Sequence, residues 1–308
     1  MSAAVLSDAG KLVGQITATG VVVTGADGKN ATSTSGTISR LLAGAVDGHP
    51  ALIAVDTDTD TAWIFNTPGT EPVAVTLPAA ATLVTRGSGV LVLSGPNLST
   101  VGLLSAGGVI SYLPPKPGMV STGVLEDGNA RWVSARGMLY IATAAGTAAN
   151  PIQLAAPADG ARVTRALWTN DATVVLAWLL PDGTTSIAAY SPTDGALLGS
   201  ATTPDDNPRL LVSPDRATAM TGPVRLDLRT GSVTVPDPTF RARTALSDGV
   251  FYGGTDTATA IQAADGSTSV VPTPHGDPIG VTSSGALLVL QATGSVATYP
   301  TTSPSPKR

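Results

Sequence analysis

The amino-acid sequence predicts an all-β protein built from repeated small antiparallel sheets. Glycine (34) and proline (24) punctuate the 308 residues between short runs of Val, Ile, Leu and Thr, which is typical of short strands joined by tight turns. Charged residues make up only 13%, fewer than the solvated faces of a helical domain of this length require. A strand–turn–strand pattern also recurs at intervals of roughly 40 residues.

Each repeat contains an apolar strand, a short polar turn with a glycine, and a second strand. Glycine suits these turns because it adopts positive φ without steric cost. The turn glycines are Gly28, Gly69, Gly107, Gly146, Gly195, Gly231 and Gly266. The hairpins that contain them are predicted over residues 21–35, 62–78, 101–114, 139–157, 187–204, 224–238 and 260–274.

Two further strands precede several of these hairpins. One unit is predicted to have strands at 82–87, 90–95, 100–105 and 109–114, and another at 242–247, 250–255, 257–262 and 267–272. Four antiparallel strands in roughly 40 residues, repeated about seven times, predict a β-propeller. A β-sandwich would show no period this regular.

The number of blades depends on the two ends of the chain. Residues 39–274 hold six full units, and residues 275–301 offer three strands. We expect seven blades, with eight as the alternative, and a ring closed by pairing of the N- and C-terminal segments, because closure removes exposed sheet edges. The expected organisation is a propeller over residues 1–300, followed by a Pro/Ser-rich tail or linker at 301–308.

Three stretches resemble known bacterial repeats: "AVLSDAGKLVGQI" (4–16), "AYSPTDGALLGS" (189–200) and "LDLRTGSVTV" (226–235). They look like the hairpins of PQQ-like and YVTN-type propeller repeats. This resemblance implies blades around a central axis and no particular activity. The Trp-rich docking motif of true quinone-binding repeats is missing, so we expect no cofactor.

The composition argues against several classes of partner and site. A formal charge of −5 and a pI near 4.9 argue against nucleic acid, because phosphate binding needs a concentrated positive field. The absence of Cys excludes disulfides, thiolate catalysis and Cys-ligated zinc. No apolar run approaches the ~20 residues that cross a bilayer, so no membrane-spanning segment is expected in this chain.

Three aspartates, Asp56, Asp58 and Asp60, alternate with threonines between two apolar runs and are the candidate metal ligands. A calcium loop of this type also needs Gly at its sixth position and Glu at its twelfth, where this chain has Thr61 and Thr67. We therefore interpret the segment as a solvated turn whose Asp side chains bind backbone N–H groups.

Arginine is unevenly distributed, and six of the thirteen arginines lie between residues 209 and 243. Arg241 and Arg243 alternate along a predicted strand and should share a face. Ion pairs with nearby aspartates are one interpretation, and a contact patch for an acidic partner or anionic glycan is the other. The candidate binding residues are Arg225, Arg229, Arg241, Arg243 and Trp168, which could be exposed at a rim.

Residues that could support catalysis are few. His49 and His275 lie in loop-like contexts, and only Glu71 and Glu126 are glutamates. No nucleophile elbow, zinc-protease, Walker or dinucleotide-binding motif is present in its required context. The longest unit, between Gly146 and Gly195, carries its extra length around residues 158–172 and 180–186, and we expect a partner-facing insertion there.

The predicted function is a non-enzymatic interaction or scaffold domain that binds a protein or cell-envelope partner. A propeller hydrolase or lyase acting on a glycan or lactone is an alternative, as is a ligand-sensing domain. The Pro/Ser-rich end predicts a linker in a larger bacterial envelope or membrane-anchored protein, and hence an extracytoplasmic or cell-surface location. A natural gene that begins and ends where this chain does would contradict that prediction.

Overall fold

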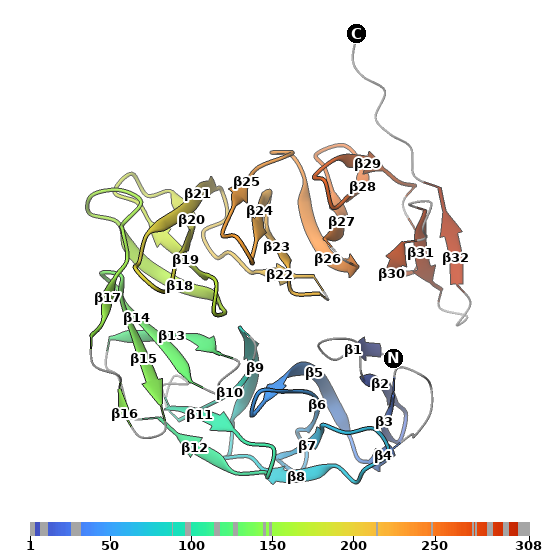
Figure 1. Ribbon diagram of the computed structural model, residues 1–308. Coiled ribbons are helices and arrows are strands. Elements are labelled where there is room, and N and C mark those ends of the chain that lie inside the picture. Colours follow the sequence, from blue (N-terminus) through green and yellow to red (C-terminus); the bar gives the residue numbers. More distant parts are fainter. Residues whose placement is uncertain are drawn as a thin grey trace. The chain divides into compact units, whose positions relative to one another are not determined.

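The computed structural model describes the chain in segments (Figure 1). They are residues 4–6, 12–25, 32–87, 89–95, 100–113, 118–125, 129–143, 146–147, 150–213, 215–247, 249–272, 274, 276–281, 286–291 and 296–300. Over these residues all the regular structure is β-strand, and no helix occurs. The all-β prediction is confirmed. The chain divides into two compact units: residues 1–155, 163–175 and 192–196 form unit 1, and residues 156–162, 176–191 and 197–308 form unit 2.

Unit 1 contains three sheets made of strands consecutive in sequence. The first is β1 (Ala4–Leu6), β2 (Leu12–Thr17), β3 (Gly20–Gly25) and β4 (Thr32–Ser35). The second joins β5 (Ile38–Val46), β6 (His49–Asp56), β7 (Thr61–Phe65) and β8 (Val73–Thr76) to β9 (Thr82–Arg86), β10 (Gly89–Ser94), β11 (Thr100–Leu104) and β12 (Ile110–Tyr112). A single parallel bridge, Gly89 to Ala45, connects these two groups of four. The third is β13 (Met119–Val124), β14 (Ala130–Ser134) and β15 (Met138–Thr143), with β16 (Gly146–Thr147) and β17 (Ile152–Gln153) both pairing β15.

The next sheet has its strands divided between the two units. It consists of β18 (Arg162–Thr169), β19 (Val174–Leu179), β20 (Thr185–Tyr190) and β21 (Leu197–Thr203). The extra length of this part of the chain forms long strands, and the turn at 180–184 is tight. The expected insertion at 158–172 is therefore largely strand β18, whose second half is buried.

Unit 2 adds three more sheets. They are β22 (Leu211–Val212), β23 (Thr218–Thr221), β24 (Val224–Asp227) and β25 (Val233–Thr234); then β26 (Arg241–Ser247), β27 (Val250–Gly254), β28 (Thr259–Gln262) and β29 (Thr268–Val270); and last β30 (Asp277–Val281), β31 (Leu287–Leu290) and β32 (Val296–Tyr299). The strands predicted at 82–114 and 242–272 agree with β9–β12 and β26–β29, and six groups of strands lie between residues 38 and 274, as expected.

The N-terminal segment differs from its prediction. It was expected to complete the three-stranded C-terminal sheet, but β1 pairs with β2, and β1–β4 form a four-stranded sheet of their own. The reason is that β1 meets a strand close to it in sequence, since Leu6 pairs with Val13. Closing so short a loop costs far less chain entropy than pairing with a strand at the other end of the chain.

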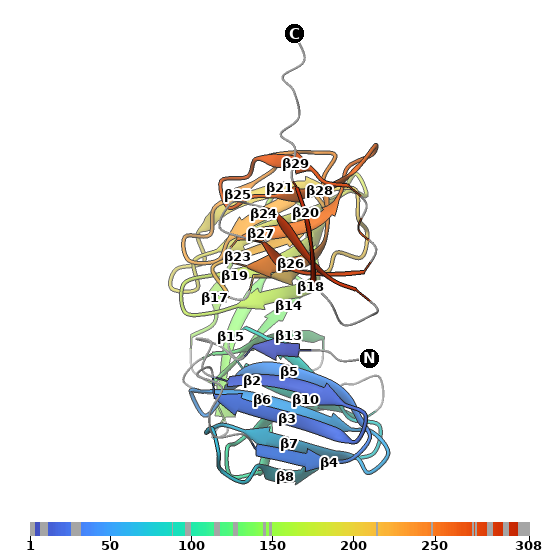
Figure 2. The same cartoon turned by 90° about the vertical axis from the view of Figure 1, so that its right-hand side faces the viewer.

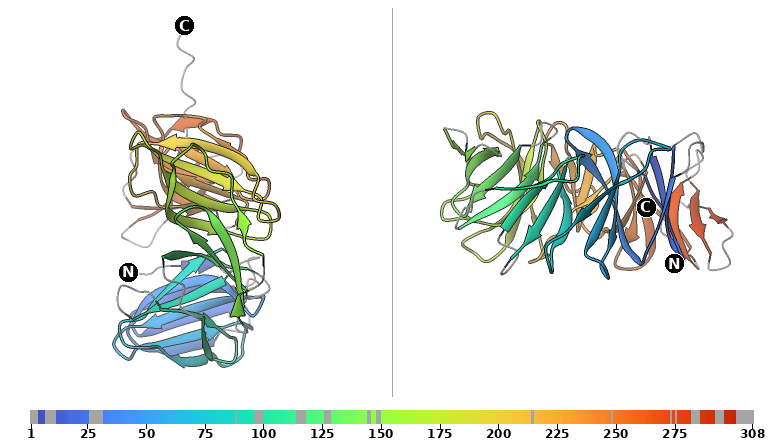
Figure 3. Two further views of the ribbon diagram at one scale, coloured as in Figure 1. Left: turned by 90° about the vertical axis from the view of Figure 1, so that its left-hand side faces the viewer. Right: turned by 90° about the horizontal axis from the view of Figure 1, so that it is seen from below.

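The group of strands β5–β8 is buried on both faces because it packs between its neighbours in chain order. Figure 2 and Figure 3 (right) show consecutive sheets of unit 1 following one another. Alternate residues of β6 point to opposite faces. Leu52 and Ala54 pack with Val21 and Val23 of the preceding sheet. Ile53, between them, packs with the next group of strands. This double burial explains why β6 and β10 are almost continuously apolar in sequence.

The same division occurs in unit 2. Phe251 of β27 packs with Met220 of the preceding sheet, whereas Tyr252, the next residue, packs with Leu287 and Val289 of β31. One strand therefore serves two cores, and the sheet β26–β29 is fixed from both sides. The loops at its ends are held on a rigid base.

The hairpin turns use glycine largely as predicted. Gly266, between β28 and β29, has φ of 86°, and its N–H donates to the carbonyl of Ala263 at 3.0 Å. In the β11–β12 turn the residue with positive φ is Gly108, with φ of 79°, and not the predicted Gly107. An adjacent pair of glycines cannot be resolved from sequence alone, because either can adopt that conformation.

Candidate functional site

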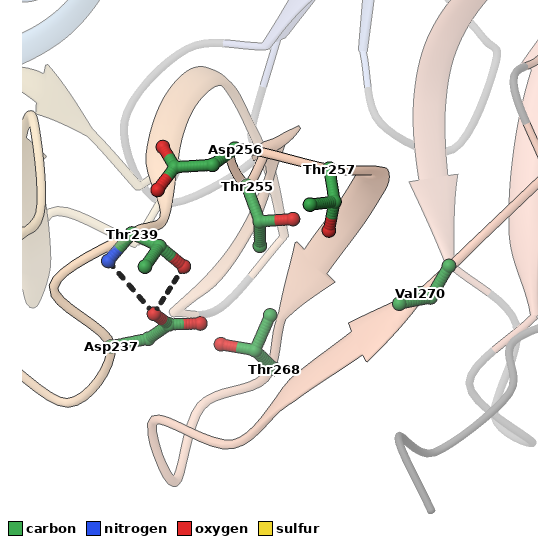
Figure 4. A pocket seen from close by; sticks show the side chains of 7 residues that line it. All are labelled: Asp237, Thr239, Thr255, Asp256, Thr257, Thr268 and Val270. Atoms are coloured by element: carbon green, nitrogen blue, oxygen red, sulfur yellow. Dashed lines mark hydrogen bonds between the residues drawn. The ribbon is translucent and has the colours of Figure 1, made fainter.

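A pocket lies at one end of the sheet β26–β29 and has a volume of about 370 Å3 (Figure 4). Three segments build it: the loop before β26, the turn between β27 and β28, and the outer strand β29. The lining residues are Asp237, Thr239, Thr255, Asp256, Thr257, Thr268 and Val270. Its polar side chains are two aspartates and four threonines, while the threonine methyl groups, Val270 and other carbon atoms of these residues supply most of the wall.

The loop before β26 is held in place by Asp237. Its Oδ1 accepts hydrogen bonds from the backbone N–H of Thr239 at 2.9 Å and from the Thr239 hydroxyl at 2.8 Å. The N–H of Phe240 donates to the Asp237 carbonyl at 3.2 Å, and the Phe240 ring is fully buried in the core. An aspartate two residues before a threonine is a favourable sequence for such a turn. The buried ring fixes the carboxylate relative to the sheet.

The β27–β28 turn supplies the opposite wall. The N–H of Thr255 donates to the Ala258 carbonyl at 2.8 Å, and the N–H of Ala258 donates to the Thr255 hydroxyl at 3.2 Å. These bonds close the turn and leave Asp256 and Thr257 exposed at its tip. Of the two carboxylates of the pocket, Asp256 is therefore exposed and Asp237 is half-buried.

The electrostatics of the pocket are set by Asp237. Burial raises the pKa of Asp237, but the hydroxyl and N–H of Thr239, with weaker help from the Thr268 hydroxyl and the Phe240 N–H, lower it more. The net pKa lies below the ordinary value for aspartate, so the carboxylate is ionised at neutral pH. The Thr268 hydroxyl faces this carboxylate in Figure 4, although its geometry does not meet that of a hydrogen bond.

Two of the predicted binding residues, Arg241 and Arg243, lie at the same end of the sheet. Arg241 pairs with Gly254, next to the Thr255–Thr257 turn, and its Nη1 donates to the carbonyls of Pro238 and Phe240. Nη2 of Arg243 lies 3.8 Å from where a side chain would begin at Gly254. Both side chains are exposed. A β-bulge between Ala242 and Thr244 interrupts the simple alternation from which a shared face was predicted.

Arg225 does not belong to this surface. Its side chain is only 8% exposed, and its guanidinium donates to Gln262 Oε1 at 3.1 Å and to the carbonyls of Gly249 and Ala264 at 2.9 Å each. It also lies 5.6 Å from the centre of the Phe251 ring. Arg225 thus connects the sheet β22–β25 to the sheet β26–β29. The surface role predicted for it is wrong, because its donors are directed inward.

The other predicted binding residues lie apart from the pocket lining. Arg229 is exposed and lies 3.8 Å from Asp215, so the ion-pair interpretation holds for this arginine. Trp168 was expected at an exposed rim, but it is only 5% exposed within β18. That expectation is wrong, because the end of β18 is covered and all four of its last residues are buried.

The three aspartates of the candidate metal site form a turn, as interpreted from sequence. Asp56 is 5% exposed, and its Oδ1 accepts hydrogen bonds from the N–H groups of Asp58 and Thr59 at 3.0 and 3.3 Å. Asp58 and Asp60 are exposed in the turn between β6 and β7. Over the described residues, no group of three or more His, Asp or Glu side chains is arranged to hold a metal ion.

The structure describes one of the two histidines. His49 is exposed at the start of β6, and His275 lies outside the described residues. The described part of the chain also contains no helix that is long and apolar enough to cross a membrane.

The chain has distant similarity to known structures. No protein-family model and no curated protein matches the chain. Among solved structures, apo AztD from Citrobacter koseri is similar over 86% of this chain and 83% of its own, with 14% identity and a TM-score of 0.47. BamB from Moraxella catarrhalis is similar over 92% and 94%, with 14% identity and a TM-score of 0.43. Virginiamycin B lyase from Staphylococcus aureus is similar over 96% and 93%, with 13% identity and a TM-score of 0.40. These are β-propeller proteins, which is consistent with the resemblance of the repeats to propeller repeat proteins.

We expect substitution of Arg225 with Met to lower the free energy of unfolding by about 1–3 kcal/mol, because it leaves the carbonyls of Gly249 and Ala264 and the Gln262 amide oxygen without their donor. Arg243→Met is the matched control and should change stability by at most about 0.5 kcal/mol, since its side chain is exposed. Urea unfolding followed by circular dichroism measures both. Equal effects of the two changes would contradict the structural role of Arg225.

The depressed pKa of Asp237 predicts a pH effect. Because the folded pKa lies below the unfolded value, the contribution of Asp237 to stability is complete above the unfolded pKa and is lost as pH falls through the folded one. Thr239→Val removes one hydroxyl donor and should raise the pKa of Asp237 toward its ordinary value. Carboxyl-carbon NMR titration of both proteins tests this, and an unchanged midpoint would refute the assigned cause.

Proposed function

We propose that this chain is a non-enzymatic β-propeller domain that binds a protein or cell-envelope partner, and that the pocket at the end of β26–β29 is its binding site. The observation that carries the proposal is the convergence of two carboxylates, four threonine hydroxyls and two neighbouring exposed arginines at one end of a sheet that is buried on both faces. A rigid base with polar loop residues at its end is a common arrangement of a recognition site.

The pKa of Asp237 favours binding over catalysis. A general acid or base works best when its pKa lies near the operating pH. The pKa of Asp237 is lowered, away from neutral pH. The hydrogen bonds from Thr239 that contribute to this lower pKa also occupy one of the carboxylate oxygens. Asp237 is therefore suited to attract a positively polarised group and not to exchange protons with a substrate.

A ligand-sensing domain is the second candidate, and the volume of the pocket favours it. About 370 Å3 falls near the lower end of the range for small-molecule sites. A sensor would bind a free small molecule in this pocket, whereas an interaction domain would receive a side chain of a partner there. The extracytoplasmic location remains a prediction from sequence.

We also propose that residues 1–300 form one closed propeller of eight blades, with residues 301–308 as a tail. The proposal is supported by the regular packing of consecutive sheets within each unit and by the N-terminal sheet of four strands, which adds a unit to the seven expected.

Small-angle X-ray scattering tests the closed ring. A compact chain of this length should give a radius of gyration of roughly 19–20 Å, slightly increased by the tail. Two units held apart would give a clearly larger value and a two-body distance distribution, which would refute closure.

For the binding site, we expect the double substitution Arg243→Glu and Arg241→Glu to reduce capture of a binding partner by tenfold or more, since reversed charges beside a site repel the groups that the arginines attract. Arg209→Glu, at another exposed arginine of unit 2, is the matched control and should leave capture unchanged. Quantitative pull-down from envelope extracts measures the three proteins side by side. Full retention of every partner by the double variant would overturn the assigned surface.

A further inference from the structure

We propose that the pocket binds a primary ammonium group carried on a short apolar stem. A lysine side chain of a partner protein and a free alkylamine share this chemistry. The inference rests on the proposed function, because it names the ligand class of the same pocket.

The lining of the pocket is complementary to a cation. Its charged side chains are both carboxylates, Asp237 and Asp256, and its other polar side chains are threonine hydroxyls. An ammonium group has three donors and no acceptor, so it requires a set of acceptors of this kind. An anion would face two negative charges and is excluded by the same lining.

The position of Asp237 favours a deep contact. Thr239 occupies its Oδ1, while the other carboxylate oxygen points toward the Thr268 hydroxyl and the pocket (Figure 4). The Thr268 hydroxyl is buried and faces this oxygen, and it contributes to the lowered pKa of Asp237. The carboxylate is thus the acceptor that Asp237 offers, and a charge-assisted hydrogen bond to a carboxylate is stronger than a neutral one.

The rest of the lining fits the stem and not a metal ion. Val270 and the methyl groups of the threonines provide apolar wall for methylene groups, which gain by leaving water. Calcium would need six to eight oxygen ligands, and one oxygen of Asp237 is already engaged. About 370 Å3 is ample for a single alkylammonium chain.

Arg241 and Arg243 add selectivity. Their exposed positive charges lie beside the β27–β28 turn, so a run of several cations would be repelled there. The ligand expected is therefore an isolated ammonium group, with neutral or acidic groups next to it. This distinguishes the pocket from a general site for basic segments.

The test is a two-dimensional NMR titration of the intact chain with matched probes. Nα-acetyl-lysine N-methylamide represents the lysine side chain, its Nε-acetylated form lacks the charge, and n-butylamine represents the free amine. We expect shifts of the Thr255, Asp256 and Thr257 amides with the charged probes, and a loss of affinity of roughly tenfold or more on acetylation or in Asp256→Asn. Asp206→Asn changes an exposed aspartate of the same unit and should have no effect.

The outcomes separate the two proposals. Tighter binding of the lysine derivative supports a partner lysine, and tighter binding of butylamine supports a free amine. Equal binding of the acetylated and charged forms, or no shifts at millimolar concentrations, would overturn the ammonium assignment. If the ammonium assignment fails but the Arg241 and Arg243 variant loses capture of the partner, the proposed function is still supported. If ammonium binding is found but the Arg241 and Arg243 variant captures partners as well as the unchanged chain does, only the proposed partner surface is refuted.

Discussion

Burial of sheets such as β5–β8 and β26–β29 on both faces by their neighbours in sequence is the constraint on which the rest of the molecule depends. A strand such as β6 must place apolar side chains on both sides, because Leu52 and Ile53 enter different cores. The same requirement makes Phe251 and Tyr252 serve two separate clusters in unit 2. Polar side chains that could bind a ligand therefore lie in the loops at the ends of the strands. The pocket between the Asp237 loop and the Thr255–Thr257 turn lies in such a place.

Buried arginines form directional hydrogen bonds between adjacent sheets. Arg225 connects two sheets of unit 2, and Arg131 of β14 donates to Thr169 and to the carbonyl of Asn170 at the end of β18. In both cases a planar cation on one sheet meets carbonyl, amide or hydroxyl oxygens on the next. Burial lowers the pKa of Arg225, but nearby Asp265 and Asp227 oppose that shift. Apolar surfaces alone could slide past each other, whereas such hydrogen bonds fix the relative position of adjacent sheets.

The strands and sheets were predictable because each depends on residues that are close together in the sequence. Short runs of Val, Ile, Leu and Thr, turn glycines and repeat spacing predicted β9–β12 and β26–β29 close to their observed bounds. The site was predictable only in part. Arg241 and Arg243 were identified from their spacing, but Arg225 has the same residue type and differs only in the direction of its side chain, which depends on Gln262 and Gly249 in the next sheet. Asp237 and Asp256 are ordinary turn residues in sequence, and only packing brings their segments to one pocket.

Strand pairing in the described sheets is almost entirely between neighbours along the chain, and the bridge from Gly89 to Ala45 is a rare link between groups. During synthesis each group can thus satisfy its backbone hydrogen bonds as soon as its own segment has left the ribosome. Its apolar faces cannot be covered until the following segment arrives. The growing polypeptide therefore has one uncovered apolar sheet face at each stage of synthesis. The most recently made sheet is accordingly the place where a chaperone would bind.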